Sequence, residues 1–185
     1  PLEIDEPSAY SQVLHEQGSV MADFGERRAR IAELVAEAAR DLKGTAVVQE
    51  EVLNEVTALV EWPVPVSGRF DEAFLELPEE VLIATLQDHQ RYFPVRAADG
   101  GLAPCFITIS NLDSPTPDAV RAGNERVVRP RLADAAFFWE QDRRSPLAAR
   151  RAQLDSVVFQ AKLGSIGQKS ERTAALAGRI ARELG

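Results

Sequence analysis

Apolar residues recur at intervals of three and four along most of the first sixty positions, which is the spacing of an amphipathic helix. The pattern predicts a short helix over residues 8–18, a longer one over residues 19–43 and a third over residues 47–62. Gly44 is the expected terminator of the second helix, and Pro63 ends the third because proline disfavours helical backbone in the preceding residue. We therefore expect the chain to open with helices that pack one apolar side on the rest of the protein.

The middle of the chain predicts a β-hairpin. Residues 64–70 have the pattern of a strand, and the proline among them places that strand at a sheet edge. A helical pattern over residues 78–90 is followed by strand patterns over residues 91–96 and 102–112. Asp99-Gly100 separates these two strands and is a strong turn signal, because glycine tolerates the positive φ of a tight turn.

Further helices are predicted in the last third of the chain. A short one covers residues 117–122, a second opens at Arg129-Pro130 and runs through Asp142, and two more cover residues 145–158 and 168–184. Helices and strands are mixed rather than strictly alternating. The predicted fold class is therefore α+β, with a small, largely antiparallel sheet and helical flanks.

Composition excludes several classes of protein. With 185 residues, 45% hydrophobic and 27% charged, the chain suits one globular domain with a helical appendage. Cys105 is the single cysteine and His15 and His89 are the only histidines, which excludes an internal disulfide and a structural zinc site. No apolar run reaches the length of a membrane span, and the acidic start does not resemble a signal peptide. We expect a cytoplasmic protein, and an internal piece of a longer one because the first residue is not Met.

The charge is distributed unevenly. The formal net charge is −8, which argues against non-specific nucleic-acid binding by the whole surface. Residues 121–151, however, carry eight arginines and four acidic residues, a net of +4. The remainder carries 13 basic and 25 acidic residues, a net of −12. The arginine segment is thus the candidate anion-binding region, because the guanidinium is a planar fork suited to phosphate.

Two polar clusters each admit two interpretations. In Asp88-His89-Gln90-Arg91-Tyr92-Phe93, the rings and Arg91 suit RNA, but residue spacing favours a helix end whose Tyr92 and Phe93 enter the core. In the segment 123–132, Arg126, Arg129 and Arg131 either contact RNA or form an internal network with nearby carboxylates such as Glu125 and Asp134. An extended backbone up to Arg129 places Arg126 on the opposite face, which weakens a simple phosphate clamp.

Familiar catalytic signatures are missing: the sequence has no GxxxxGK[ST], GxGxxG, HExxH or GxSxG motif. Long segments carry a resemblance instead, namely EVTALVEWPV (55–64), DHQRYFPV (88–95), ISNLDS (109–114), GNERVVRPRLADAAFFWEQD (123–142) and VVFQAKLGSIGQKSER (157–172). In this order they closely resemble the beta chain of bacterial-type, heterotetrameric glycyl-tRNA synthetase. A twenty-residue motif is far more specific than a short pattern.

The resemblance implies an enzyme of two alpha and two beta chains that joins glycine to its tRNA with ATP, through glycyl-adenylate. In that family the alpha chain resembles a class II catalytic core and mainly binds the ATP, with Mg expected, whereas the beta chain mainly supplies tRNA-binding domains. The implied partners are glycine tRNA and the alpha chain, with no membrane and no DNA. We expect no cofactor in this piece and no catalysis by it alone, so the purified chain should not support glycine-dependent pyrophosphate exchange.

The family also suggests a domain organisation. Residues 1–46 are the expected N-terminal helical segment, and residues 47–158 a tRNA-binding domain similar to the editing-type domain of the phenylalanyl-tRNA synthetase beta chain. Residues 159–185 are the expected linker and start of a following HD-type helical domain. The leading hypothesis is a module that holds the acceptor arm of glycine tRNA, with contacts from Arg126, Arg129, Arg131, His89 and Arg91. The alternatives are a hydrolytic editing domain, which a deep polar pocket near His89 favours, and a structural connector, which a large exposed apolar patch favours.

Overall fold

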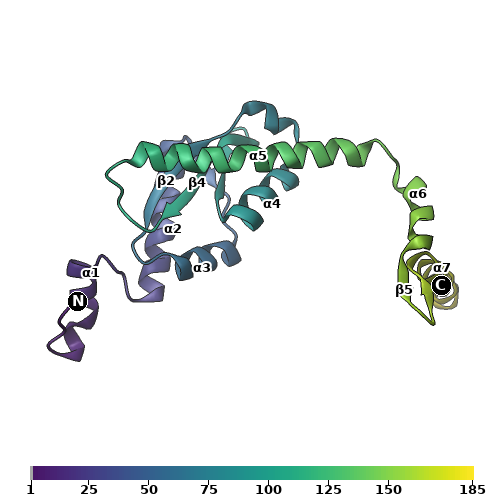
Figure 1. The fold of residues 1–185 in the computed structure, drawn as a ribbon, viewed down its shortest axis with the longest axis horizontal. Coiled ribbons are helices and arrows are strands. Elements are labelled where there is room, and N and C mark those ends of the chain that lie inside the picture. Colours follow the sequence, from purple (N-terminus) through teal and green to yellow (C-terminus); the bar gives the residue numbers. More distant parts are fainter. Residues whose placement is uncertain (1) are drawn as a thin grey trace. The chain divides into compact units, whose positions relative to one another are not determined.

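A four-stranded antiparallel sheet organises the larger part of the structure (Figure 1). Its strands are β1 (Gly44–Ala46), β2 (Val64–Arg69), β3 (Phe93–Ala97) and β4 (Leu102–Ser110), in the order β1-β3-β4-β2. The computed structural model describes residues 2–185 and confirms the predicted α+β class. β2 lies at one edge, as its proline predicts. The sequence patterns did not predict β1, which forms the other edge.

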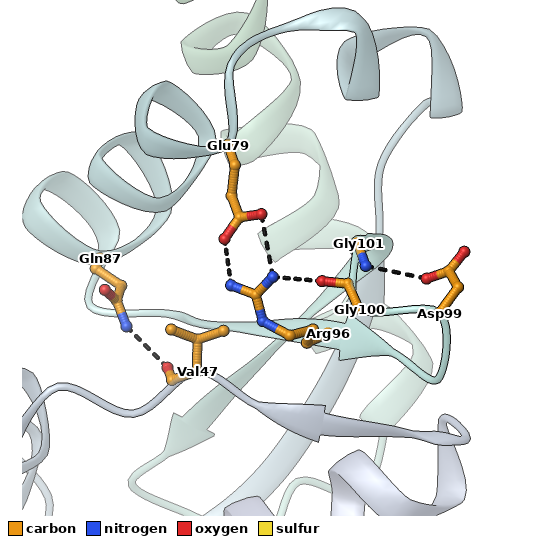
Figure 2. A network of polar contacts seen from close by, with 7 residues as sticks. All are labelled: Val47, Glu79, Gln87, Arg96, Asp99, Gly100 and Gly101. Carbon is orange, nitrogen blue, oxygen red and sulfur yellow. Dashed lines mark hydrogen bonds and ion pairs between the residues drawn. The ribbon is translucent and has the colours of Figure 1, made fainter.

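The hairpin between β3 and β4 has the predicted turn. Gly100 adopts a φ of 92°, a conformation that an L side chain rarely takes. The Asp99 carboxylate accepts a hydrogen bond from the Gly101 N–H at 3.0 Å (Figure 2). The Ala97 N–H donates to the Gly101 carbonyl at 2.8 Å. The prediction of a turn at residues 99–101 is thus confirmed.

The N-terminal helices differ in their bounds from the prediction. The short 3-10 helix η1 (Pro7–Ala9) leads into α1 (Tyr10–Gly18), and α2 spans Phe24–Asp41. The predicted start of the second helix at residue 19 was wrong because Ser19, with a φ of 51°, ends α1. The Asp23 carboxylate then accepts from the Glu26 N–H at 2.8 Å and caps the first turn of α2.

The main core lies on the face of the sheet that α2 and α3 (Glu50–Leu59) cover. It is built from aliphatic residues of both helices and from alternate residues of β3 and β4: Ile31, Val35, Ala38, Ala39, Val52, Leu53, Val56, Val60, Phe93, Val95, Cys105, Ile107 and Ile109. The alternation follows from the two-residue repeat of a strand. Burial raises the pKa of the Cys105 thiol, and the charge of Arg69 opposes that shift.

The opposite face of the sheet is organised around Phe106, which is fully buried. The Tyr92 ring stacks on it with centroids 4.8 Å apart, and Gly68 of β2 lies beneath it. A Cβ atom on Gly68 would lie 2.4 Å from the Phe106 ring, so glycine is required at that position. The 3-10 helix η2 (Glu72–Glu76) follows β2, and α4 (Glu79–Gln90) buries Leu82 and Leu86.

The helix α5 (Pro117–Arg143) corrects the prediction for its region, because residues 117–143 form one continuous helix. The two separate helices and the extended backbone predicted before Arg129 were wrong. Pro130 lies inside α5, where it has no N–H to give the Arg126 carbonyl. The position is exposed, whereas Val128 and Leu132 on either side of it are buried, so tertiary packing holds the helix across the proline.

The structure has two compact units, and the second comprises Phe137–Gly185. It contains α6 (Leu147–Arg150), the 3-10 helix η3 (Arg151–Ser156), β5 (Val158–Gln160), β6 (Gly164–Ser165) and α7 (Ile166–Leu184). The α-helix predicted over residues 145–158 ends at Arg150, and η3 continues as a 3-10 helix to Ser156. Val158 then begins β5, which pairs with β6 in an antiparallel ribbon that local patterns did not reveal. α7 begins with a capping box between Ser165 and Gln168.

Candidate nucleic-acid interface

The helix α5 presents all three arginines of the 123–132 cluster. With about 100° of rotation per helical residue, Arg126 and Arg129 lie roughly 60° apart on one flank of the helix. Arg131 lies on the other flank, roughly 160° from Arg129. The helix therefore brings together Arg126 and Arg129, which an extended chain would have placed on opposite faces.

Arg129 and Arg131 border a narrow buried stripe of α5, and Arg126 lies on the side of the helix away from it. Val128 and Leu132, one turn apart, are the buried residues of α5, with 1% and 0% of their surface exposed. Two hydrogen bonds add to this anchoring: the Tyr92 hydroxyl donates to Asn124 Oδ1 at 2.5 Å, and the Arg69 N–H donates to Glu125 Oε1 at 2.9 Å. The flanks of α5 are thus held at fixed positions relative to the sheet.

The three guanidinium groups have no internal partner. Within residues 2–185, Arg126, Arg129 and Arg131 are exposed, and none of their side chains makes a hydrogen bond or an ion pair. Glu125 instead accepts from the Arg69 backbone. The internal network considered from the sequence is therefore not formed in this part of the chain, and three cations remain open to an external anion.

A pocket of about 520 Å³ lies beside Arg129, between the end of β2, η2 and α5. It is lined by two aromatic, two basic and two acidic residues: Phe70, Phe74, Arg69, Arg129, Asp71 and Glu125. Both carboxylates are engaged by backbone donors, since Asp71 caps η2 through the Ala73 N–H at 3.0 Å and Glu125 holds the Arg69 N–H. The Arg129 guanidinium is left without a counter-charge in contact.

Arg69 contributes to this pocket in a limited way. In the register of β2 with β4 it lies opposite Cys105, so its side chain shares the sheet face of Cys105 rather than that of Phe106. The charge of Arg69 accordingly acts on the Cys105 thiol, where it opposes the rise in pKa that burial causes. Arg129 is therefore the cation that the pocket itself presents.

The second predicted cluster, residues 88–93, makes contacts within the protein at the end of α4. Arg91 ends α4 with a φ of 58°, and its guanidinium donates to the carbonyls of Gln87 and Asp88. Its Nε lies 2.5 Å from Glu55 Oε2, an ion-pair distance without hydrogen-bond geometry. Tyr92 is buried, as the structural interpretation predicted, and His89 lies exposed in the last turn of α4. The structure does not join His89 or Arg91 to the arginines of α5.

A polar network fixes α4 against the sheet (Figure 2). Both oxygens of Glu79 face the Arg96 guanidinium, with one contact at 3.0 Å, and Arg96 also donates to the Gly100 carbonyl. The hydrogen bond from Arg96 holds the pKa of Glu79 below its ordinary value, against a smaller opposing effect of desolvation. Gln87 is fully buried and donates to the Val47 carbonyl at 2.8 Å. This network holds α4 and β3, and Tyr92 reaches α5 from the short link between them.

The matching family model is described as the glycyl-tRNA synthetase beta subunit and covers residues 1–185. The chain belongs to that family. Curated relatives named glycine–tRNA ligase beta subunit include those of Azotobacter vinelandii, 53% identical over 182 residues, and Marinobacter nauticus, 51% identical over 179 residues. A third, from Pseudomonas aeruginosa, is 50% identical over 182 residues. These alignments cover 98%, 96% and 98% of this chain but 26% of each relative, so the chain spans about a quarter of their length.

Sequence reasoning missed the aromatic part of the candidate interface in this glycyl-tRNA synthetase family member. Phe70 directly follows an edge strand and Phe74 lies four residues further on, which is a spacing signal. The sequence does not show that both residues lie beside α5. Among residues 2–185 no group of acidic, His and Cys side chains is arranged to hold a metal ion. None of the helices in that range combines the length and apolar character needed to cross a membrane.

Proposed function

We propose that this chain is a tRNA-binding module of a glycine–tRNA ligase beta chain and holds the acceptor arm of glycine tRNA. The observation that carries the proposal is the set of three exposed arginines on α5, which have no partner among residues 2–185, in a chain whose formal net charge is −8. Arginine stays charged and donates two parallel hydrogen bonds to a phosphate. The acidic remainder repels the RNA backbone, so the arginine flank also sets the orientation of the bound RNA.

The intact ligase, in this proposal, consists of alpha and beta chains acting in the cytoplasm. ATP, with Mg, is bound mainly by the alpha chain, and this chain contributes no catalytic group. Arg126, Arg129 and Arg131 are the principal phosphate contacts. His89 is a further candidate contact because it is exposed, whereas Arg91 is secondary because Glu55 and two carbonyls already engage it.

Single substitutions to glutamine test this role. In the intact ligase, Arg126→Gln, Arg129→Gln and Arg131→Gln should weaken binding of glycine tRNA and flatten its dependence on salt by roughly one unit of log–log slope for each phosphate that is no longer neutralised. The melting temperature should hardly change, because these side chains have no internal partner. Arg30→Gln is the matched control, since Arg30 is exposed and pairs with Glu33 at 3.3 Å on α2. Unchanged affinity and salt slope in all three variants would refute the proposal.

A connector role for the second unit is favoured by a separate observation. Leu176, Ile180 and Leu184 lie at intervals of four along α7, with 58%, 47% and 83% of their surface exposed. Residues spaced by four share one face of a helix, so α7 presents an apolar stripe that a further protein surface would cover. The editing alternative rests on the family resemblance alone.

A further inference from the structure

The pocket beside Arg129 has features that phosphate binding on the flank of α5 does not require. A backbone contact needs only an exposed guanidinium, whereas this cavity also presents two phenylalanines and two carboxylates. Its volume of about 520 Å³ lies in the range of small-molecule sites, roughly 300–1,000 Å³. A cavity of that size admits one nucleotide but not a base pair within a double helix.

The two aromatic residues are half-buried, and hydrogen bonds fix their main chain. The Phe70 N–H donates to the Pro104 carbonyl at 3.1 Å, and the Phe74 N–H donates to the Asp71 carbonyl at 3.0 Å. Both residues line the cavity, and neither belongs to the hydrophobic core cluster on the α2 and α3 side. Aromatic side chains at the wall of a cavity suit stacking with a nucleic-acid base, because stacking tolerates any base identity.

The polar groups complement a nucleotide as well. Glu125 uses Oε1 for the Arg69 N–H, so Oε2 remains free to accept from a ribose 2′-hydroxyl or a base amino group. Arg129 follows Glu125 by one helical turn and therefore lies on the same flank, next to the cavity. Arg126 lies one turn before Arg129 and extends the positive surface outward from it.

We propose that this cavity holds a single unpaired nucleotide of the bound tRNA, with its base against Phe70 and Phe74, its phosphate at Arg129 and a sugar or base donor at Glu125. The inference rests on the proposed function, since it concerns the same RNA on the same flank of α5. It adds a binding mode in which one nucleotide leaves the stack and enters the protein. An unpaired position suits this mode because no base pair has to be broken.

Substitutions at Phe74 and at Arg129 separate base stacking from phosphate binding in the intact ligase. Phe74→Ala should weaken binding of glycine tRNA about five-fold to 150-fold, the range typical of a missing base–aromatic stack, and leave the salt slope unchanged. Arg129→Gln should flatten that slope. Phe24→Ala, at an exposed phenylalanine of α2, is the matched control and should bind tRNA like the parent. If Phe74→Ala does not fold, Phe74→Leu replaces it as the test. Leucine keeps apolar volume at the site but has no ring to stack, so this variant should also bind tRNA more weakly.

Crosslinking identifies the occupant directly. A photoreactive benzophenone analogue of phenylalanine replaces Phe74 in the intact ligase, and the complex with glycine tRNA is irradiated and mapped by reverse transcription. One crosslink to an unpaired nucleotide supports the proposal. Crosslinks to paired nucleotides or to protein, or no crosslink at all, overturn the proposal of a nucleotide pocket. If the arginine variants still flatten the salt slope in that case, the proposed tRNA-binding function stands without the pocket. If the arginine variants also bind normally, both proposals fail.

Discussion

Replacing Leu132 with alanine should weaken the attachment of α5 to the sheet. Leu132 has none of its surface exposed, and it shares the burial of α5 only with Val128. Burying a leucine contributes about 1.5–3 kcal/mol by transfer alone, and the cavity left by truncation adds to that loss. Leu→Ala changes in cores cost about 2–5 kcal/mol. Because one of only two buried anchors is removed, we expect a loss of about 3 kcal/mol in the free energy of unfolding of the first unit.

Guanidinium denaturation followed by fluorescence measures this loss. Trp62 belongs to the first unit and Trp139 to the second, so a Trp139→Phe background restricts the signal to the first unit. Leu59→Ala is the matched control, because Leu59 is 65% exposed and its truncation should change stability by no more than about 0.5 kcal/mol. Equal losses for Leu132→Ala and Leu59→Ala would show that α5 is not anchored through Leu132.

Two further predictions concern glycines and one ion pair. Gly68→Ala should destabilise the first unit by about 1–3 kcal/mol, because the added Cβ meets the Phe106 ring. Gly123→Ala should stabilise it by about 0.5–1 kcal/mol, because a Cβ at this position of α5 lies in open space. Thermal melts in which Gly123→Ala is not the more stable variant would contradict this reasoning. Glu79 has a depressed carboxyl pKa, so its ion pair stabilises the fold at neutral pH, and this contribution disappears as the pH falls below the ordinary glutamate value of about 4.3 and through the pKa of the folded state. The stability difference between the parent and Glu79→Gln should therefore shrink on acidification, and a difference that does not vary with pH would argue against the pair.

Local signals determined the features of the chain that depend on a few neighbouring residues. The hairpin followed from Asp99-Gly100, since a positive φ at Gly100 needs no tertiary support. The edge position of β2 followed from Pro65, which has no N–H for a second ladder. The long family motif likewise placed the chain in the glycyl-tRNA synthetase beta subunit family, as the match over residues 1–185 bears out.

Tertiary structure decided the features for which local signals were weak or pointed elsewhere. Pro130 signals a break, yet the burial of Val128 and Leu132 carries α5 through it and brings Arg126 and Arg129 to one flank. β1 is too short to show a two-residue pattern and exists because β3 offers it a partner. The candidate pocket joins Phe74 to residues of α5 far along the chain, and no local pattern encodes such a contact, because only the packing of α5 against the end of β2 brings those segments together.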